Sequence, residues 1–185
     1  MSERIIERDA ISMYEADMAK YSIIVNRRRA IPAVQDGLKP VQRRILFGAY
    51  KDHMTSPAKR DKSASLTGTV MRAYHPHSEC YGTVATMLQW FRNKVPLMYG
   101  HGNWGNLTGS GPAAQRYTET ALSEYGYETM IDELTQSNNI VDWIETYKRN
   151  GDMEPEYLPS KVPNILVNGT FGIALGLQVN VPTHN

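Results

Sequence analysis

Arg116 and Tyr117 stand side by side directly after a glycine-rich segment, and their types suit phosphoryl chemistry. A phenol is almost entirely protonated at neutral pH and is then a poor nucleophile. A neighbouring guanidinium favours the phenolate and also stabilises negative charge on a phosphate during transfer. Because the chain has eleven tyrosines, most of which are expected to be core or surface aromatics, the pair is informative only together with its surroundings.

The common motifs for a metal site, a serine nucleophile or a P-loop are missing from the sequence. His75, His77 and Cys80 are closely spaced, but a zinc site usually needs four ligands and the remaining histidines are distant in the chain. No Asp-x-Asp pair, His-Glu-x-x-His motif or Gly-x-Ser-x-Gly motif occurs. The glycines near residue 105 are not followed by Gly-Lys-Ser/Thr, which disfavours binding of nucleotide phosphates. The sequence therefore predicts no metal site in this chain.

The charges are unevenly distributed although the net charge is only +1. Residues 20–72 hold twelve Lys and Arg against three Asp, a net charge of +9, whereas residues 118–160 have a net charge of −8. A basic segment of this kind is typical of a surface that binds a polyanion such as DNA. The alternative is that both segments are simply solvated surfaces.

Length and cysteine content place further limits on the chain. Its 185 residues suffice for one domain and the beginning of a second, and 41% of them are apolar, as in a globular protein. The single cysteine, Cys80, cannot form an internal disulfide, which suits a reducing compartment. No signal peptide is recognisable, and polar residues interrupt the apolar stretch 162–182, so we expect a cytoplasmic protein outside the membrane.

Four helices are expected in the first half. One begins after Asp9 as N-cap and ends near residues 27–29, and a second begins at Pro40. A third begins at Ser63 and ends before His75, because Pro76 disfavours helical geometry in the residue preceding it. The fourth has Val84, Met87, Leu88 and Phe91 on one face. Short helices with a basic start are typical of a helix-turn-helix.

The second half shows a different pattern. Five glycines within residues 100–111 favour a hairpin or wing over a helix. Beyond Thr118, the spacing of Leu122, Tyr125, Met130 and Leu134 predicts an amphipathic helix. Residues 162–181 are expected to form short strands joined through Asn168-Gly169. The fold class expected is therefore α+β, a winged-helix domain with a β wing followed by the start of a second, α/β domain.

The chain resembles the A subunits of bacterial type IIA DNA topoisomerases, DNA gyrase and topoisomerase IV. The resemblance rests on six ordered blocks that cover nearly the whole chain: SIIVNRRRAIP at 22–32, DGLKPVQRR at 36–44, YHPH at 74–77, GHGNWG at 100–105, AAQRYTE at 113–119 and LPSKVPNILVNG at 158–169 followed by GIA at 172–174. It implies an N-terminal helix that docks on a partner subunit (1–30), a winged-helix DNA-cleavage domain (31–150) and the start of a tower domain (151–185). The chain would then be an N-terminal fragment of such an A subunit.

The resemblance also implies the chemistry. Tyr117 would attack a DNA phosphate to form a reversible 5′-phosphotyrosyl link, with Arg116 as its helper. Mg²⁺ and ATP would be bound by the partner B subunit, and two A subunits would assemble with two B subunits as an A2B2 heterotetramer. Positions that contact double-stranded DNA in the family correspond to Arg29, Lys39, Gln42, Arg43, Arg44, His75 and His77, and Ile173 corresponds to an isoleucine wedged between base pairs.

This chain departs from the family pattern at several of these positions. Gln42 stands where the family usually has His, and Ser78 stands where it usually has Gly. In the family, a Ser and an acid anchor quinolone drugs, and Cys80 and Val84 stand at these two positions here. A thiol is a weak hydrogen-bond partner and valine is none. These replacements therefore predict weaker drug binding.

Two other functions compete with a topoisomerase. A non-catalytic winged-helix regulator would need the same basic helices and wing, but not Arg116-Tyr117 after the wing. A tyrosine recombinase also uses Tyr with Arg and His, but its His-x-x-Arg pattern is absent from the sequence.

Overall fold

The computed structural model describes residues 9–76, 80–137 and 139–184. The helices are α1 (Ala10–Arg29), α2 (Pro40–Lys51), η1 (Pro57–Lys59, a 3₁₀ turn), α3 (Ser63–Ala73), α4 (Tyr81–Leu88), α5 (Glu124–Met130), α6 (Asp132–Gln136) and α7 (Asn164–Val167). The strands are β1 (Asp61–Lys62), β2 (Met98–His101), β3 (Glu119–Leu122), β4 (Trp143–Glu145), β5 (Met153–Pro155), β6 (Thr170–Ile173) and β7 (Gln178–Val181).

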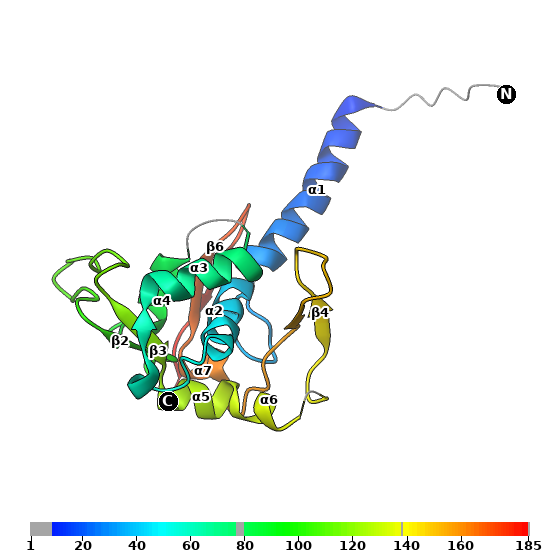
Figure 1. Cartoon of the computed structure of the whole chain (residues 1–185). Coiled ribbons are helices and arrows are strands. Elements are labelled where there is room, and N and C mark those ends of the chain that lie inside the picture. Colours follow the sequence, from blue (N-terminus) through cyan, green and yellow to red (C-terminus); the bar gives the residue numbers. More distant parts are fainter. Residues whose placement is uncertain (1–8, 77–79, 138, 185) are drawn as a thin grey trace.

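Helix α1 projects from the body of the molecule (Figure 1). Its N-cap is Asp9, as expected, whose carboxylate accepts a hydrogen bond from the Ser12 backbone N–H at 2.9 Å. Three arginines in the last turn complement the negative end of the helix dipole. Its apolar side chains lie in the open, with Ile11 and Tyr14 each 68% exposed and Tyr21 58% exposed.

Helices α2, α3 and α4 form the centre of the core, and α3 and α4 lie over α2 in Figure 1. Ile45, Leu66, Val70 and Val84 are fully buried between them. The predicted starts of α2 at Pro40 and of α3 at Ser63 are confirmed. The fourth predicted helix is too long, because α4 ends at Leu88 and Gln89 already has an extended backbone, which leaves Phe91 outside it.

The expected wing is present as a small antiparallel sheet with strand order β1-β3-β2. Strand β2 pairs with β3 from Met98↔Leu122 to His101↔Glu119, and residues 102–118 form the long loop between them. Gly100, Gly102 and Gly105 have the spacing of a dinucleotide-binding motif. They lie in β2 and this loop rather than between a strand and a helix, so the structural context of that motif is absent.

Two sequence-based predictions in the second half are wrong. Leu122 ends β3 instead of starting a helix, and the amphipathic stretch is divided into α5 and α6 at Ile131. The pair Asn168-Gly169 joins α7 to β6 rather than two strands, and the turn of the β6–β7 hairpin lies at residues 174–177. Periodicity over few residues does not separate a short strand from a short helix.

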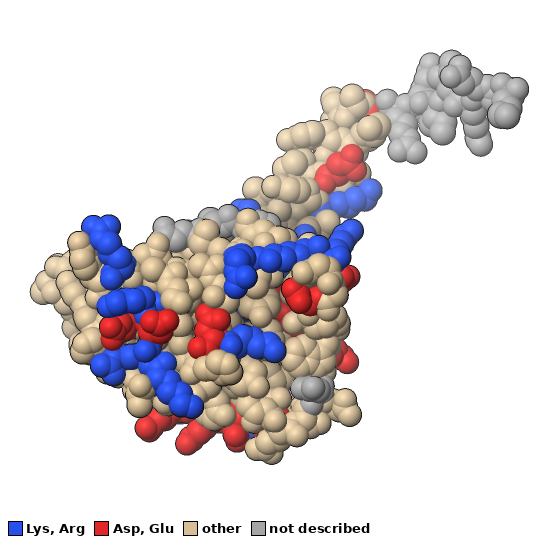
Figure 2. Space-filling model, in the orientation of Figure 1, with Lys and Arg blue, Asp and Glu red and all other residues tan. Residues whose placement is uncertain are grey.

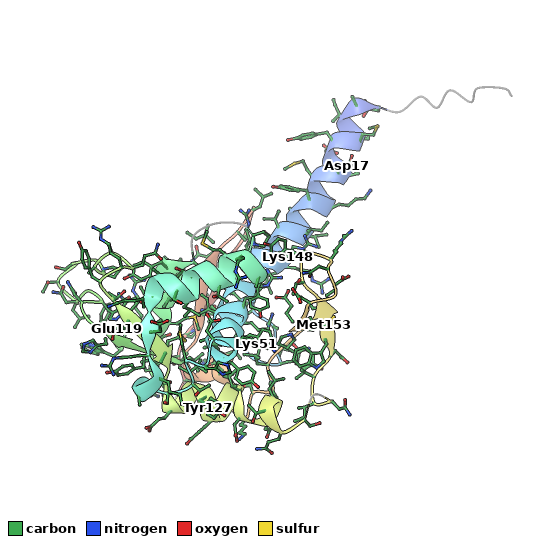
Figure 3. The ribbon with its side chains drawn as sticks, viewed as in Figure 1. Asp17, Lys51, Glu119, Tyr127, Lys148 and Met153 are labelled. Carbon is green, nitrogen blue, oxygen red and sulfur yellow. The ribbon has the colours of Figure 1, made fainter. Side chains whose placement is uncertain are left out.

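The β4–β5 hairpin packs beside the helices. Its turn, which carries Lys148, lies next to the end of α3 (Figure 3), where the Tyr147 hydroxyl donates to the Arg72 carbonyl at 2.8 Å. The expected domain boundary between residues 150 and 151 falls in this turn, and Leu158 beyond it is fully buried in the same core. The mixture of helices and small antiparallel sheets confirms the α+β class and fits a winged-helix-like domain.

Within the part of the chain that the structure describes, no helix has the combination of length and apolar character that crossing a membrane requires.

Candidate active site

Tyr117 and Arg116 lie in the wing loop, immediately before β3. The Tyr117 side chain is 64% exposed, so a large substrate can reach its hydroxyl. The Arg116 guanidinium carbon lies 4.6 Å from the centre of the Tyr117 ring, in cation–π contact. The structure therefore brings together the two residues that the sequence paired, with the phenol open to solvent and a fixed positive charge beside it.

Lys and Arg side chains gather on the wing and around the base of α1 in Figure 2, while Asp and Glu gather on the opposite edge, over α5 and α6. This agrees with the separation of charge that the sequence predicts. Cations lie close to Tyr117, since Arg116 contacts its ring and Lys62 pairs with Glu119, two residues further along the chain. Arg60 and Lys62 are partly neutralised there by Glu119, the acid labelled on the wing in Figure 3, whose pKa is lowered by hydrogen bonds from these two residues.

Arg43 is turned mostly into the core, and its expected role as a DNA contact stays a prediction. It is only 8% exposed, and its guanidinium donates to both carboxylate oxygens of Asp36 at 2.5 and 2.9 Å. Asp36 is fully buried and also accepts hydrogen bonds from the backbone N–H groups of Leu38 and Leu158. The Arg43 guanidinium neutralises a buried carboxylate, which gives this residue a structural role in the core.

Arg44 and His75 lie next to each other, and their contact with DNA stays a prediction. Arg44 donates to Glu154 at 2.6 and 2.9 Å, and its Nη1 lies 3.3 Å from His75 Nδ1. Glu154 is 3% exposed, whereas the Arg44 side chain keeps 22% of its surface in solvent. Glu154 had no signal in the sequence, because nothing local relates it to a position 110 residues earlier.

Lys39 and Gln42 make hydrogen bonds inside the protein. The Gln42 side chain accepts from the Lys39 backbone N–H at 2.9 Å and so caps α2. The Lys39 ammonium donates to the Phe171 carbonyl at 2.5 Å, and burial lowers the pKa of this ammonium. Lys39 thus connects the start of α2 to the β6–β7 hairpin, and the contact of Lys39 and Gln42 with DNA stays a prediction.

Arg29 and Ile173 are exposed, as their expected roles require. Ile173, at the end of β6, is 76% exposed. The hairpin that carries it is joined to α1 by Asn26, whose side-chain amide bonds both backbone groups of Leu175, at 3.1 Å to the carbonyl and 2.9 Å from the N–H. His77 lies outside the described residues.

Cys80 and Val84 do not line an open surface. Cys80 is 1% exposed and Val84 is fully buried, and both belong to the core of α2, α3 and α4. The weaker drug binding that these two positions predict is not tested by their burial and stays a prediction. Among the described residues, no group of three or more His, Cys, Asp or Glu side chains is placed to hold a metal ion.

Comparison with known proteins gives a consistent result. The family model for the A subunit of DNA gyrase/topoisomerase IV matches residues 29–185. The DNA gyrase A subunit of Streptococcus pneumoniae serotype 4 is 43% identical over 173 residues, which are 92% of this chain and 21% of the relative. The corresponding proteins of Staphylococcus epidermidis and Staphylococcus aureus are 42% and 41% identical over 184 residues, 98% of this chain and 20% of each relative.

The chain thus spans about a fifth of the length of these relatives. The family match covers the wing, the loop with Arg116 and Tyr117, and the β6–β7 hairpin with Ile173. The chain belongs to the family of DNA gyrase and topoisomerase IV A subunits.

Proposed function

We propose that this chain is part of the DNA breakage-reunion subunit of an ATP-dependent type IIA topoisomerase. The observation that carries the proposal is the exposed Tyr117 with the Arg116 guanidinium against its ring, on the wing of a winged-helix-like fold in a member of the gyrase family. A non-catalytic regulator would need the fold but not this pair. We keep the proposed division into a docking helix (1–30), a cleavage domain (31–150) and the start of a tower domain (151–185).

The proposed reaction is a transesterification on each DNA strand. Tyr117 Oη loses its proton and attacks a backbone phosphorus, the bond from phosphorus to the 3′-oxygen breaks, and the leaving oxygen takes up a proton as a 3′-hydroxyl. The Arg116 guanidinium stabilises the negative charge that builds up on the phosphate oxygens. Because one phosphoester replaces another, the reverse attack by the 3′-hydroxyl reseals the strand without ATP.

In the proposed assembly, a partner subunit supplies the metal site and the ATP site. They offer no carboxylate cluster for Mg²⁺, so we assign the metal site and the ATP site to a B subunit in a cytoplasmic A2B2 complex. When bound there, Mg²⁺ would add positive charge near the scissile phosphate. The described residues of this chain bind DNA, place the phenol and provide the guanidinium.

Ile173 is expected to bend DNA by inserting between base pairs. In the full-length protein in complex with its B subunit, Ile173→Gly should reduce the bend angle, measured by energy transfer between labelled DNA ends, while the affinity changes within a few fold. A wedge residue offsets the cost of unstacking a base step, which is a few kcal/mol per step, whereas phosphate contacts supply most of the affinity.

The neighbouring Phe171 is 58% exposed on the same strand, and Phe171→Gly serves as the matched control. An unchanged bend angle in Ile173→Gly, or an equal loss in the control, would remove Ile173 from the wedge position.

A gel assay for protein covalently bound to DNA tests the proposed function. The full-length protein is incubated with its B subunit, Mg²⁺ and supercoiled plasmid, and the reaction is stopped with detergent before protease treatment. The topoisomerase assignment predicts broken DNA with protein on its 5′ ends that disappears when the metal is chelated before denaturation. Intact plasmid under all conditions would favour the regulator, and linkage to 3′ ends without the B subunit would favour a recombinase.

A further inference from the structure

A chain of buried hydroxyl groups lies beneath the loop that carries Tyr117. The Tyr81 hydroxyl donates to the Ala113 carbonyl at 2.5 Å and lies 3.0 Å from Thr118 Oγ1, which lies 2.8 Å from Ser63 Oγ. Ser63 and Thr118 are fully buried, and Tyr81 is 8% exposed. Water does not easily reach groups at this depth. Each hydroxyl therefore depends on the neighbouring hydroxyl as its hydrogen-bond partner.

The Tyr81 hydroxyl contacts both ends of the short segment that contains the proposed catalytic pair. Ala113 precedes this segment and Thr118 follows it, while the segment itself turns back through the hydrogen bond from the Tyr117 N–H to the Ala114 carbonyl at 2.9 Å. Gln115, inside the segment, accepts a hydrogen bond from Thr67 Oγ1 at 2.6 Å. Hydrogen bonds from the protein interior thus fix the segment 113–118, while the Tyr117 side chain extends into solvent.

The groups that hold the segment come from α3 and α4, which we assign as the two helices of the expected helix-turn-helix. Ser63 is the first residue of α3 and Tyr81 is the first residue of α4. The Ser63 N–H donates to the Thr118 carbonyl at 3.0 Å, and the Tyr81 ring packs on Trp104 with 5.4 Å between ring centres. In a helix-turn-helix these helices set the position of bound DNA. The hydroxyl chain therefore connects the elements that hold the DNA with the residue that attacks it.

We propose that Tyr81 and Thr118 are positioning residues that set the distance from Tyr117 Oη to the scissile phosphate through this hydroxyl chain. The proposal rests on the proposed role of Tyr117 as nucleophile. Neither residue touches DNA or the reacting atoms, since both are buried. Their loss slows the chemical step and leaves DNA affinity nearly unchanged, because reaction rates depend steeply on the geometry of attack and phosphate contacts lie elsewhere.

The test uses the full-length protein in complex with its B subunit, Mg²⁺ and a labelled DNA duplex. Tyr81→Phe removes one hydroxyl, Thr118→Val replaces a hydroxyl by a methyl group of the same shape, and Thr118→Ser keeps the hydroxyl. The matched control is Thr120→Val, because Thr120 is also fully buried on β3 and donates to a backbone carbonyl, that of Tyr99 at 2.9 Å, away from the Tyr117 segment. Single-turnover cleavage rate, DNA dissociation constant and melting temperature are measured for each.

We expect Tyr81→Phe and Thr118→Val to lower the cleavage rate constant about 10- to 100-fold, as a misplacement of the order of 1 Å would do, with the DNA dissociation constant within about threefold. Thr118→Ser restores most of the rate. Thr118→Val and Thr120→Val both lower the melting temperature, Thr118→Val by at least as much because its hydroxyl has two buried partners and that of Thr120 has one, but only Thr118→Val slows cleavage.

Unchanged cleavage in Tyr81→Phe and Thr118→Val would overturn the proposal, and so would an equal defect in Thr120→Val, which would make the effect one of stability. Tyr117→Phe is measured in parallel to separate a failure of the positioning role from a failure of the proposed function. If wild type forms the covalent complex and Tyr117→Phe does not, the nucleophile stands and only the positioning role is at issue. If Tyr117→Phe still forms the complex, the proposed function itself fails.

Discussion

Tyr117→Phe in the assembled full-length enzyme is expected to reduce DNA cleavage by at least about 10³-fold, to the background of the assay, because the substitution removes the only atom that forms the ester. The ring and its contact with the Arg116 guanidinium remain, and Tyr117 is largely exposed, so the fold and the DNA affinity should change little. The measurement is the amount of covalent complex on a gel, together with the DNA dissociation constant from a filter or anisotropy assay.

The matched control for this variant is Tyr147→Phe. Tyr147 is also exposed, at 41%, and its hydroxyl donates to a backbone carbonyl at the end of α3, away from the wing loop. Tyr147→Phe should cleave DNA as wild type does. Covalent complex that survives in Tyr117→Phe, or a loss of similar size in Tyr147→Phe, would show that the nucleophile is another residue or that any lost tyrosine hydroxyl disturbs the enzyme.

Arg43→Ala is expected to lower the free energy of unfolding of the 185-residue chain by about 3 to 5 kcal/mol, because it leaves the buried Asp36 carboxylate without its counter-charge. Asp36 lies at the junction of the 31–39 segment, α2 and the segment at Leu158, so the loss affects three parts of the core at once. Urea unfolding followed by far-ultraviolet circular dichroism measures this free energy.

Lys161→Ala is the control for Arg43→Ala, because Lys161 forms an ion pair with Asp132 in which both side chains are about one-third exposed. Ion pairs of this kind contribute at most about 1 kcal/mol. If Arg43→Ala instead left stability unchanged and weakened DNA binding with a smaller salt dependence, Arg43 would be a phosphate contact as the family resemblance implies, and its place in the core would be wrong.

The elements that depend on neighbouring residues were predictable. The N-cap Asp9, the helix start at Pro40 and the glycine-rich wing are each specified within a few residues of chain, since capping, proline geometry and glycine's low helix propensity act locally. The contact between Arg116 and Tyr117 was also predictable, because neighbours in sequence stay neighbours in space. The exact ends of α4, α5 and β6 were not, since tertiary packing rather than periodicity sets the ends of short elements.

The direction in which each side chain points could not be read from the sequence. Arg43 and Arg44 are adjacent cations of one type, yet helix geometry turns one inward to Asp36 and leaves the other partly exposed beside Glu154. Tyr81 and Thr118 carried no catalytic signal, because their hydroxyls meet only when α4 packs against the wing. The sequence alone determines the helix caps, the glycine-rich wing loop and the chemistry available at Arg116 and Tyr117. Burial, pairing of charges and the support beneath Tyr117 depend on contacts between segments far apart in sequence, which exist only in the folded core.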